Sequence, residues 1–168
     1  LPFLALHSHF LVRLHKFNYI LMSSHQDHSQ LIWQIADLLR GPYRPPQYER
    51  VMLPMTVLRR FDCVLASSKE AVLKKHEQLK TKFEGKALDT MLNKVADQKF
   101  HNRSPLDFEK MKGAPDSIAQ DLGSYIHGFS ENVKQIFEYF EFEKEIEKMN
   151  KDNILYLIVS KFSTVDLH

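Results

Sequence analysis

Hydrophobic residues recur at intervals of three and four along most of the chain, a spacing typical of helices with one buried face. In the first such run the hydrophobic positions are Leu31, Ile32, Ile35, Leu38 and Leu39. Later runs with this spacing predict helices over about 47–65, 86–98, 117–127, 130–140 and 153–162. Alternation of apolar and polar residues never extends beyond a few positions, so the pattern predicts no strand. We therefore expect an all-α domain of seven to nine helices without a substantial β-sheet.

Capping residues and prolines set the expected helix ends. Ser29 has the hydroxyl of a typical N-cap, and Gly41 supplies a C-terminal stop to the same helix. Pro54 lies inside the second helix, where it removes one ladder hydrogen bond, so we expect a kink there rather than a break. Ser104 followed by Pro105 predicts the start of a further short helix.

The first 21 residues are largely apolar but contain five basic or titratable residues. These are His7, His9, Arg13, His15 and Lys16. A membrane span needs ~20 mostly apolar residues, and charges near its centre are costly, so this segment predicts no membrane helix. It also lacks the clean apolar core and small-residue cleavage site of a signal peptide. Our hypothesis is that Met22 is the true start, with residues 1–28 a non-native or poorly ordered leader and 29–168 the folded domain.

Composition adds a charge asymmetry to this picture. Residues 50–112 carry 14 Lys or Arg against 8 Asp or Glu, whereas residues 113–168 carry 5 against 10. A basic middle suits a phosphate backbone and an acidic end suits a protein partner, but both also fit solvated helix faces. Cys63 is the single cysteine, which excludes an internal disulfide and favours a reducing cytoplasm.

Residues that carry catalysis or bind cofactors are scarce in this chain. The five glycines are scattered and form no phosphate-binding loop. The pairs His7/His9 and His25/His28 have spacings that a metal can use, but a polar segment without metal is the better interpretation. Next to Pro45-Pro46, Arg44 and Gln47 replace the flanking residues of the Asn-Pro-Pro-aromatic motif of amino-methyltransferases. We predict no catalytic, cofactor-binding or metal-binding residue.

Two stretches carry motifs of a known family. Residues 31–65 include Ala-Asp-Leu-Leu-Arg-Gly at the end of the first helix and Leu-Arg-Arg near the end of the second. Residues 117–168 include Tyr-Ile-His-Gly-Phe-Ser-Glu-Asn-Val, then Phe-Glu-Phe, and finally Leu-Tyr-Leu-Ile-Val-Ser-Lys-Phe with Asp-Leu-His at the end. In this order the motifs resemble the helical N-terminal domain of type I restriction–modification DNA methyltransferase (M) subunits. Pro54 departs from the family pattern.

The resemblance implies a role inside a larger bacterial restriction enzyme. The full subunit would transfer a methyl group from S-adenosylmethionine to adenine N6 in DNA, in a catalytic domain expected after His168. It would work in the cytoplasm as two copies with a specificity subunit, and a motor/nuclease subunit can join them. The fragment itself is expected to be inactive, to bind no cofactor and to contact no membrane. The chain end after Val165 lacks a helix stop, which favours this interpretation over a free-standing helical DNA- or protein-binding module.

Four arginines are the candidate DNA contacts. Arg40 and Arg44 flank the proline-rich loop, and Arg59 and Arg60 lie near the end of the second helix. Cations beside a fixed backbone favour phosphate contacts. The alternative is that they are solvated charges or partners of Asp37, Glu49 and Asp62.

Overall fold

The computed structural model describes residues 27–168, so the predictions for Met22 and for residues 1–26 of the leader lie outside this range. Within it, the chain forms nine α-helices and two 3₁₀ turns, and no strand, which confirms the all-α prediction. In chain order the elements are α2 (Asp27–Leu39), η1 (Pro45–Gln47), α3 (Glu49–Leu65), α4 (Lys69–Leu79), α5 (Gly85–Ala96), α6 (Phe108–Lys112), η2 (Pro115–Ser117), α7 (Ile118–His127), α8 (Glu131–Tyr139), α9 (Phe142–Lys151) and α10 (Leu155–Ser163). None of these helices is long and apolar enough to cross a membrane.

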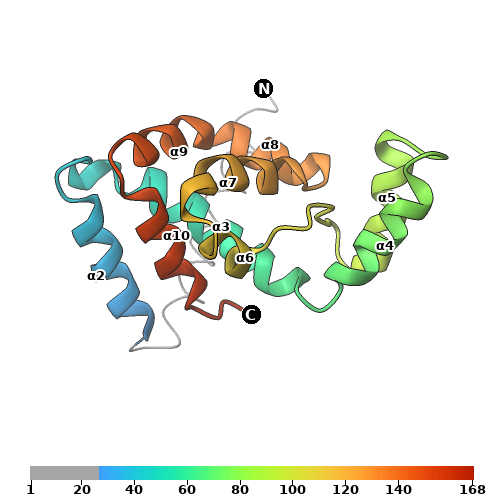
Figure 1. Cartoon of the computed structure of the whole chain (residues 1–168), viewed down its shortest axis with the longest axis horizontal. Helices are drawn as coiled ribbons and strands as arrows, with labels where there is room; N and C mark the ends of the chain where they lie inside the picture. The colour runs from blue at the N-terminus through green and yellow to red at the C-terminus, as the bar shows by residue number, and fades with distance from the viewer. Residues whose placement is uncertain (1–26) are drawn as a thin grey trace, which may run out of the picture.

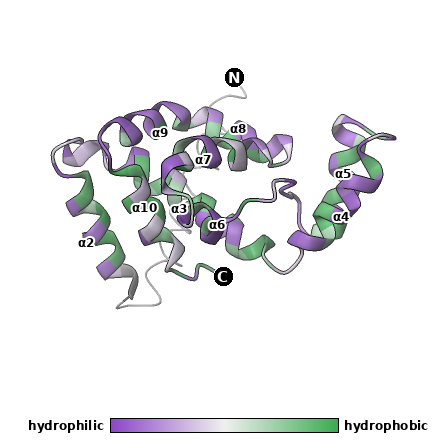
Figure 2. Cartoon of the chain, viewed as in Figure 1, coloured by the Kyte–Doolittle hydropathy of each residue, from purple (hydrophilic) through white to green (hydrophobic). Residues whose placement is uncertain are grey.

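Seven of the helices pack into one body around α10 (Figure 1). This central helix contacts α2, α3, α6, α7 and α9, and its residues Leu155, Ile158, Val159 and Phe162 are buried. Its neighbour α9 is coloured mostly as hydrophilic in Figure 2, because only one face of α9 is apolar. A helix that is apolar over most of its surface belongs inside a domain, and one with a single apolar stripe belongs at its edge. The apolar faces of the seven helices together form the hydrophobic core of the body.

The helices α4 and α5 form a hairpin that projects from one side of the body (Figure 1). We call residues 69–99 the arm. The two helices pack mainly on each other, and their buried side chains are Val72 on α4 and Leu88, Leu92 and Ala96 on α5. Residues 80–87, which join the helices and begin α5, are all exposed. The arm is therefore a small two-helix unit whose tip is surrounded by solvent.

Three predicted features of the helix ends had different outcomes. The first helix begins at Asp27, so Ser29 lies inside it and the predicted N-cap is wrong. The helix α3 continues unbroken through Pro54, which confirms that the helix does not break there, and the kink stays a prediction. The helix predicted at Ser104-Pro105 begins later, at Phe108, where the Asp107 carboxylate accepts a 2.8 Å hydrogen bond from Lys110 N. The Asp107 cap is the better start because its side chain satisfies one of the free amides of the first turn.

The segment before α6 instead crosses the turn after α7. Arg103 N donates to Gly128 O (2.8 Å), and Ser130 N donates to His101 O (3.0 Å). A Cβ at Gly128 would lie 2.6 Å from Asn102 Oδ1 and 2.7 Å from Ser104 Cβ, so only glycine fits. The Gly-Phe-Ser part of the family motif thus shapes a crossing of two backbone segments.

Candidate nucleic-acid interface

The four candidate arginines separate into an exposed pair and an internal pair. Arg40 and Arg44 are both exposed, at the end of α2 and before η1. Arg40 Nη2 lies 3.1 Å from Asp37 Oδ1, and both side chains are largely solvent-accessible, so this ion pair is weak. Arg44 forms no ion pair within residues 27–168. Both guanidinium groups are available to a phosphate.

The loop between these two arginines is anchored by Tyr43. Its ring is buried, and its hydroxyl donates a 2.8 Å hydrogen bond to Glu145 Oε2 on α9. Lys148 Nζ, also from α9, lies 3.8 Å from the centre of the Tyr43 ring, in cation–π contact. The backbone that presents Arg40 and Arg44 is therefore held against the body.

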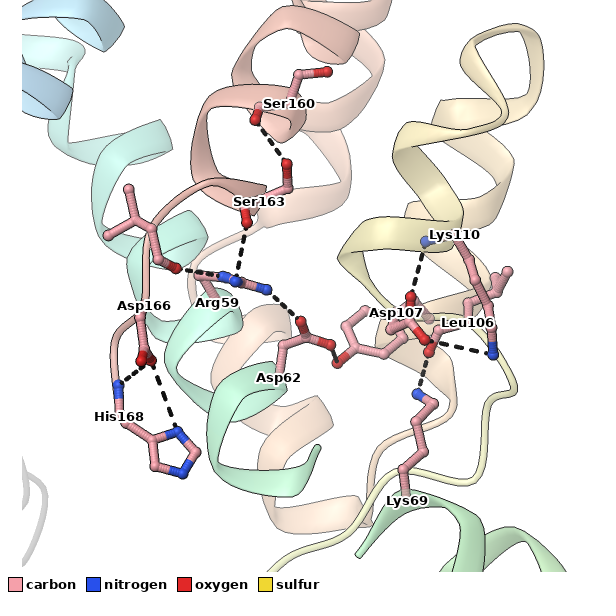
Figure 3. A network of polar contacts seen from close by, with 12 residues as sticks. Arg59, Asp62, Lys69, Leu106, Asp107, Lys110, Ser160, Ser163, Asp166 and His168 are labelled. Atoms are coloured by element: carbon pink, nitrogen blue, oxygen red, sulfur yellow. Dashed lines mark hydrogen bonds and ion pairs between the residues drawn. The ribbon is translucent and has the colours of Figure 1, made fainter. Parts of the chain in front are cut away.

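Arg59, shown in Figure 3, and its neighbour Arg60 hold the C-terminal segment onto α3. Arg59 Nε donates to Val165 O (2.8 Å), and Nη2 donates to Ser163 O (3.0 Å). Its Nη1 lies 2.7 Å from Asp62 Oδ2, and its side chain is only 14% exposed. Arg60 Nη1 donates to Leu167 O. A phosphate would reach Arg59 only by displacing three interactions, so contact between these two arginines and DNA stays a prediction.

Asp62 is the buried acid at the centre of this network. One carboxylate oxygen accepts from Arg59 and the other accepts a 2.7 Å hydrogen bond from the Tyr125 hydroxyl on α7. Burial raises the pKa of Asp62, while the bonds from Tyr125 and Arg59 oppose this effect. Burial and the neighbouring carboxylate raise the pKa of Tyr125 well above its usual value, so its hydroxyl remains a donor. The two residues join α3 to α7.

Lys69, the first residue of α4, ties the arm to the same network. Its ammonium donates to Leu106 O and lies 5.2 Å from the centre of the Tyr125 ring. Burial lowers the pKa of Lys69. In Figure 3 the network continues to Asp107 and Lys110 on one side and to Asp166 and His168 on the other.

A cleft beside this network has the wrong charge for phosphate. Its acidic lining residues are Asp62, Asp107, Glu109 and Asp166, whereas its Lys and Arg residues are only Arg59 and Lys69. Both cations are already engaged by neighbouring groups of the chain. An anion would meet four carboxylates there and no cation that is free to pair with it, so the cleft does not suit the binding of DNA.

Comparison with protein-family models matches residues 28–162 to the HsdM N-terminal domain. The chain belongs to this family. The family is the N-terminal domain of M subunits of type I restriction–modification systems, as the sequence motifs indicated. No curated protein and no solved structure matches the chain.

The match extends over the arm and its junction with the body of this HsdM N-terminal domain. Here sequence reasoning missed His101, which is fully buried. Asn93 Nδ2 donates to Lys99 O, so Asn93 Oδ1 accepts the 2.7 Å hydrogen bond from His101 Nδ1. His101 Nε2 makes no hydrogen bond and lies 3.7 Å from Asp89 Oδ1. Burial lowers the pKa of His101 to about 4. A single histidine in a predicted loop gives no sequence signal for this role.

The described residues of the domain hold no group of three or more His, Cys, Asp or Glu side chains placed for a metal ion. Of the four histidines with metal-like spacing, His7, His9 and His25 lie outside the described residues. Cys63 is buried on α3. The chemistry available in this part of the chain is hydrogen bonding and charge pairing.

Proposed function

We propose that this HsdM N-terminal domain closes on duplex DNA and packs against the other subunits of a type I restriction–modification methyltransferase. Its partners would be the specificity subunit, a second M subunit and, in the restricting complex, the motor/nuclease subunit. The observation that carries the proposal is the family match over residues 28–162. The excess of acids over residues 113–168 supports a protein contact, and the exposed cations elsewhere support contact with phosphate.

Methyl transfer from S-adenosylmethionine to adenine N6 is proposed for the full-length subunit, not for these residues. The five glycines lie singly, at Gly41, Gly85, Gly113, Gly123 and Gly128, and no two of them form a loop around a cofactor. That these residues bind no S-adenosylmethionine stays a prediction, and the contribution proposed for this chain is to hold the DNA and the partner subunits.

Duplex binding by the purified chain tests the DNA part of this proposal. The dissociation constant would be measured by fluorescence anisotropy with a labelled duplex of mixed sequence, between 50 and 200 mM salt. Each phosphate contact contributes a slope of about −0.9 to the logarithmic plot, so three to four contacts weaken binding on the order of 40- to 150-fold over that range. Binding that ignores salt, or no binding at all, contradicts the proposal.

The subunit contact needs a separate test. A specificity subunit from the same system would be mixed with the chain, and the mass of the mixture followed by light scattering at physiological salt. A stable complex supports the proposal. If the chain binds DNA but neither the specificity subunit nor another M subunit, a free-standing DNA-binding module becomes the better description.

A further inference from the structure

The helix α5 of the arm has one buried and one basic face. Leu88, Leu92 and Ala96 are spaced by four and buried. Lys86, Thr90 and Lys94 are also spaced by four, and all three are exposed. Residues four apart lie on the same side of a helix, so these three form a row along the outer face. We call Lys86, Thr90, Lys94 and the following exposed Lys99 the α5 stripe.

Little negative charge compensates the α5 stripe. The helix contains one acid, Asp89, whose carboxylate lies 3.7 Å from the buried His101 Nε2 and accepts from Glu131 N at 3.4 Å. That carboxylate is engaged at the junction with the body. The exposed acids at the ends of the helix are Glu84, at the N-cap, and Asp97, at the C-cap, and neither forms an ion pair with a stripe lysine within the described residues.

Within residues 27–168 the lysines of the stripe form no ion pair, unlike several lysines elsewhere. Lys80, Lys134 and Lys144 each lie within 2.7 Å of a glutamate three residues earlier. Among the residues that the structure describes, no acid lies within ion-pairing distance of the ammonium groups of Lys86, Lys94 and Lys99. A cation without a protein partner keeps its full attraction for an external anion.

An open groove lies at the root of the α5 stripe. It is lined by Thr90, Asn93, Lys94, Asp97, Gln98 and Lys99. The Lys94 and Lys99 ammonium groups and the Gln98 amide supply hydrogen-bond donors of the kind that phosphate oxygens accept. Thr90 donates its own hydroxyl to Lys86 O (2.7 Å), which keeps this short side chain close to the helix between the two lysines.

The root of the stripe is fixed to the body. Lys99 O accepts hydrogen bonds from Asn93 Nδ2 (3.1 Å) and Asn132 Nδ2 (3.0 Å). The next residue, Phe100, packs on Phe61 of α3 with ring centres 4.5 Å apart. The stripe is therefore held on a rigid base before any ligand binds, which reduces the ordering cost of binding.

We propose that the α5 stripe is a binding site for the phosphate backbone of duplex DNA. The assignment rests on the proposed function and places the contact on the projecting arm. The loop with Arg40 and Arg44 lies at the opposite end of the molecule (Figure 1). A projecting helix with two lysines about two turns apart, followed by a third just beyond its end, matches a linear array of phosphates, and the contact requires no base recognition.

The test compares two triple variants of the full chain with the same change in net charge. The first is Lys86→Gln/Lys94→Gln/Lys99→Gln, and the control is Lys144→Gln/Lys151→Gln/Lys161→Gln on α9 and α10. Anisotropy with the labelled duplex is measured between 50 and 200 mM salt. We expect the stripe variant to bind on the order of 10- to 100-fold more weakly at 100 mM salt and to lose about 0.9 of slope per contact, while the control changes less than about threefold.

The outcomes separate this surface from the proposed function. If the wild-type chain binds no DNA, both fail. If it binds and the stripe variant matches the control, the surface is wrong and the function stands, and a large loss in Arg40→Gln/Arg44→Gln then identifies the α2–α3 loop instead. Should the triple variant fail to fold by circular dichroism, the single variants Lys86→Gln and Lys94→Gln replace it, each expected to bind about two- to fivefold more weakly. Wild-type affinity in both singles overturns the proposal.

Discussion

Where α3 meets the C-terminal segment and the start of the arm, basic side chains are turned toward acids and carbonyls of the chain itself, whereas along α5 the lysines are turned toward solvent. Arg59, Arg60 and Lys69 donate to backbone carbonyls, and Arg59 also pairs with a buried carboxylate. Lys86 and Lys94 have no such partner within the described residues. In the first region the positive charges hold segments of the chain together, and on α5 they remain available to an external anion. The difference is whether the chain itself supplies a partner for the cation.

The largest effect is expected from removing the buried acid of the internal network. Asp62→Ala removes the partner of both Arg59 and Tyr125 and leaves a buried cation uncompensated. We expect the free energy of unfolding to fall by about 3–5 kcal/mol, measured by urea denaturation. The matched control is Asp37→Ala, which removes only the exposed pair with Arg40 and costs less than about 1 kcal/mol. Equal effects of the two substitutions would show that the buried network contributes no special stability.

The second prediction concerns the backbone crossing that joins arm and body. Gly128→Ala places a methyl group 2.6 Å from Asn102 Oδ1 and 2.7 Å from Ser104 Cβ, so it forces the two segments apart. We expect a loss of about 2–3 kcal/mol in urea denaturation. Gly123→Ala, inside α7 with no atom within 4 Å of the new Cβ, is expected to stabilise by about 0.5–1 kcal/mol. A mild Gly128 variant would mean that the crossing adjusts freely.

The third prediction uses the depressed pKa of His101. Its folded pKa is about 4 and its usual value 6.5, so below pH 6.5 the unfolded chain binds the proton more readily. Stability attached to His101 is therefore present at pH 7 and is lost as the pH falls toward 4. The groups that set this value are Asp89, Arg103 and His76, with burial the main cause.

Comparison with His101→Gln isolates this effect from other titrations. From pH 7 to pH 5 we expect the wild type to lose roughly 1–2 kcal/mol more stability than the variant, in urea denaturation at each pH. Parallel pH profiles for the two proteins would remove His101 as the source of acid sensitivity.

The smallest effect on stability is expected from substituting the exposed lysines of α5. Lys86→Gln and Lys94→Gln remove exposed charges without a protein partner. Each should change the free energy of unfolding by less than about 0.5 kcal/mol. A loss above 1 kcal/mol would indicate that these lysines stabilise the fold, which would contradict their description as cations without a partner.

Much of the fold was predictable because each helix carries its own periodic signal. The spacing of Leu155, Ile158, Val159 and Phe162 identified α10, and burial confirms it. Helix starts were harder to predict. Ser104 has the hydroxyl of an N-cap, but in the structure its backbone N–H donates to Asn102 Oδ1 in a turn before the helix. At such positions a distant segment, here Gly128, decides the local structure.

The candidate site was harder to predict because a sequence does not show which partner a cation meets. Arg59 and Asp62 are three residues apart, so their pairing was an open alternative. The carbonyls of Ser163 and Val165 that occupy the rest of Arg59 are more than 100 residues away in the chain. Conversely, the sequence of α5 is that of an ordinary charged helix. Only the structure shows that its one acid, Asp89, faces His101 and so lies away from the lysines on the outer face.

Lysine footprinting tests most directly whether the lysines of the α5 stripe are the ones that meet DNA. The full chain would be labelled with an amine-reactive reagent with and without saturating duplex DNA, and the modification of each lysine quantified by mass spectrometry. We expect DNA to protect Lys86, Lys94 and Lys99, while the exposed Lys144 and Lys151 of α9 label at unchanged rates. Equal labelling of the α5 stripe with and without bound DNA would contradict the account.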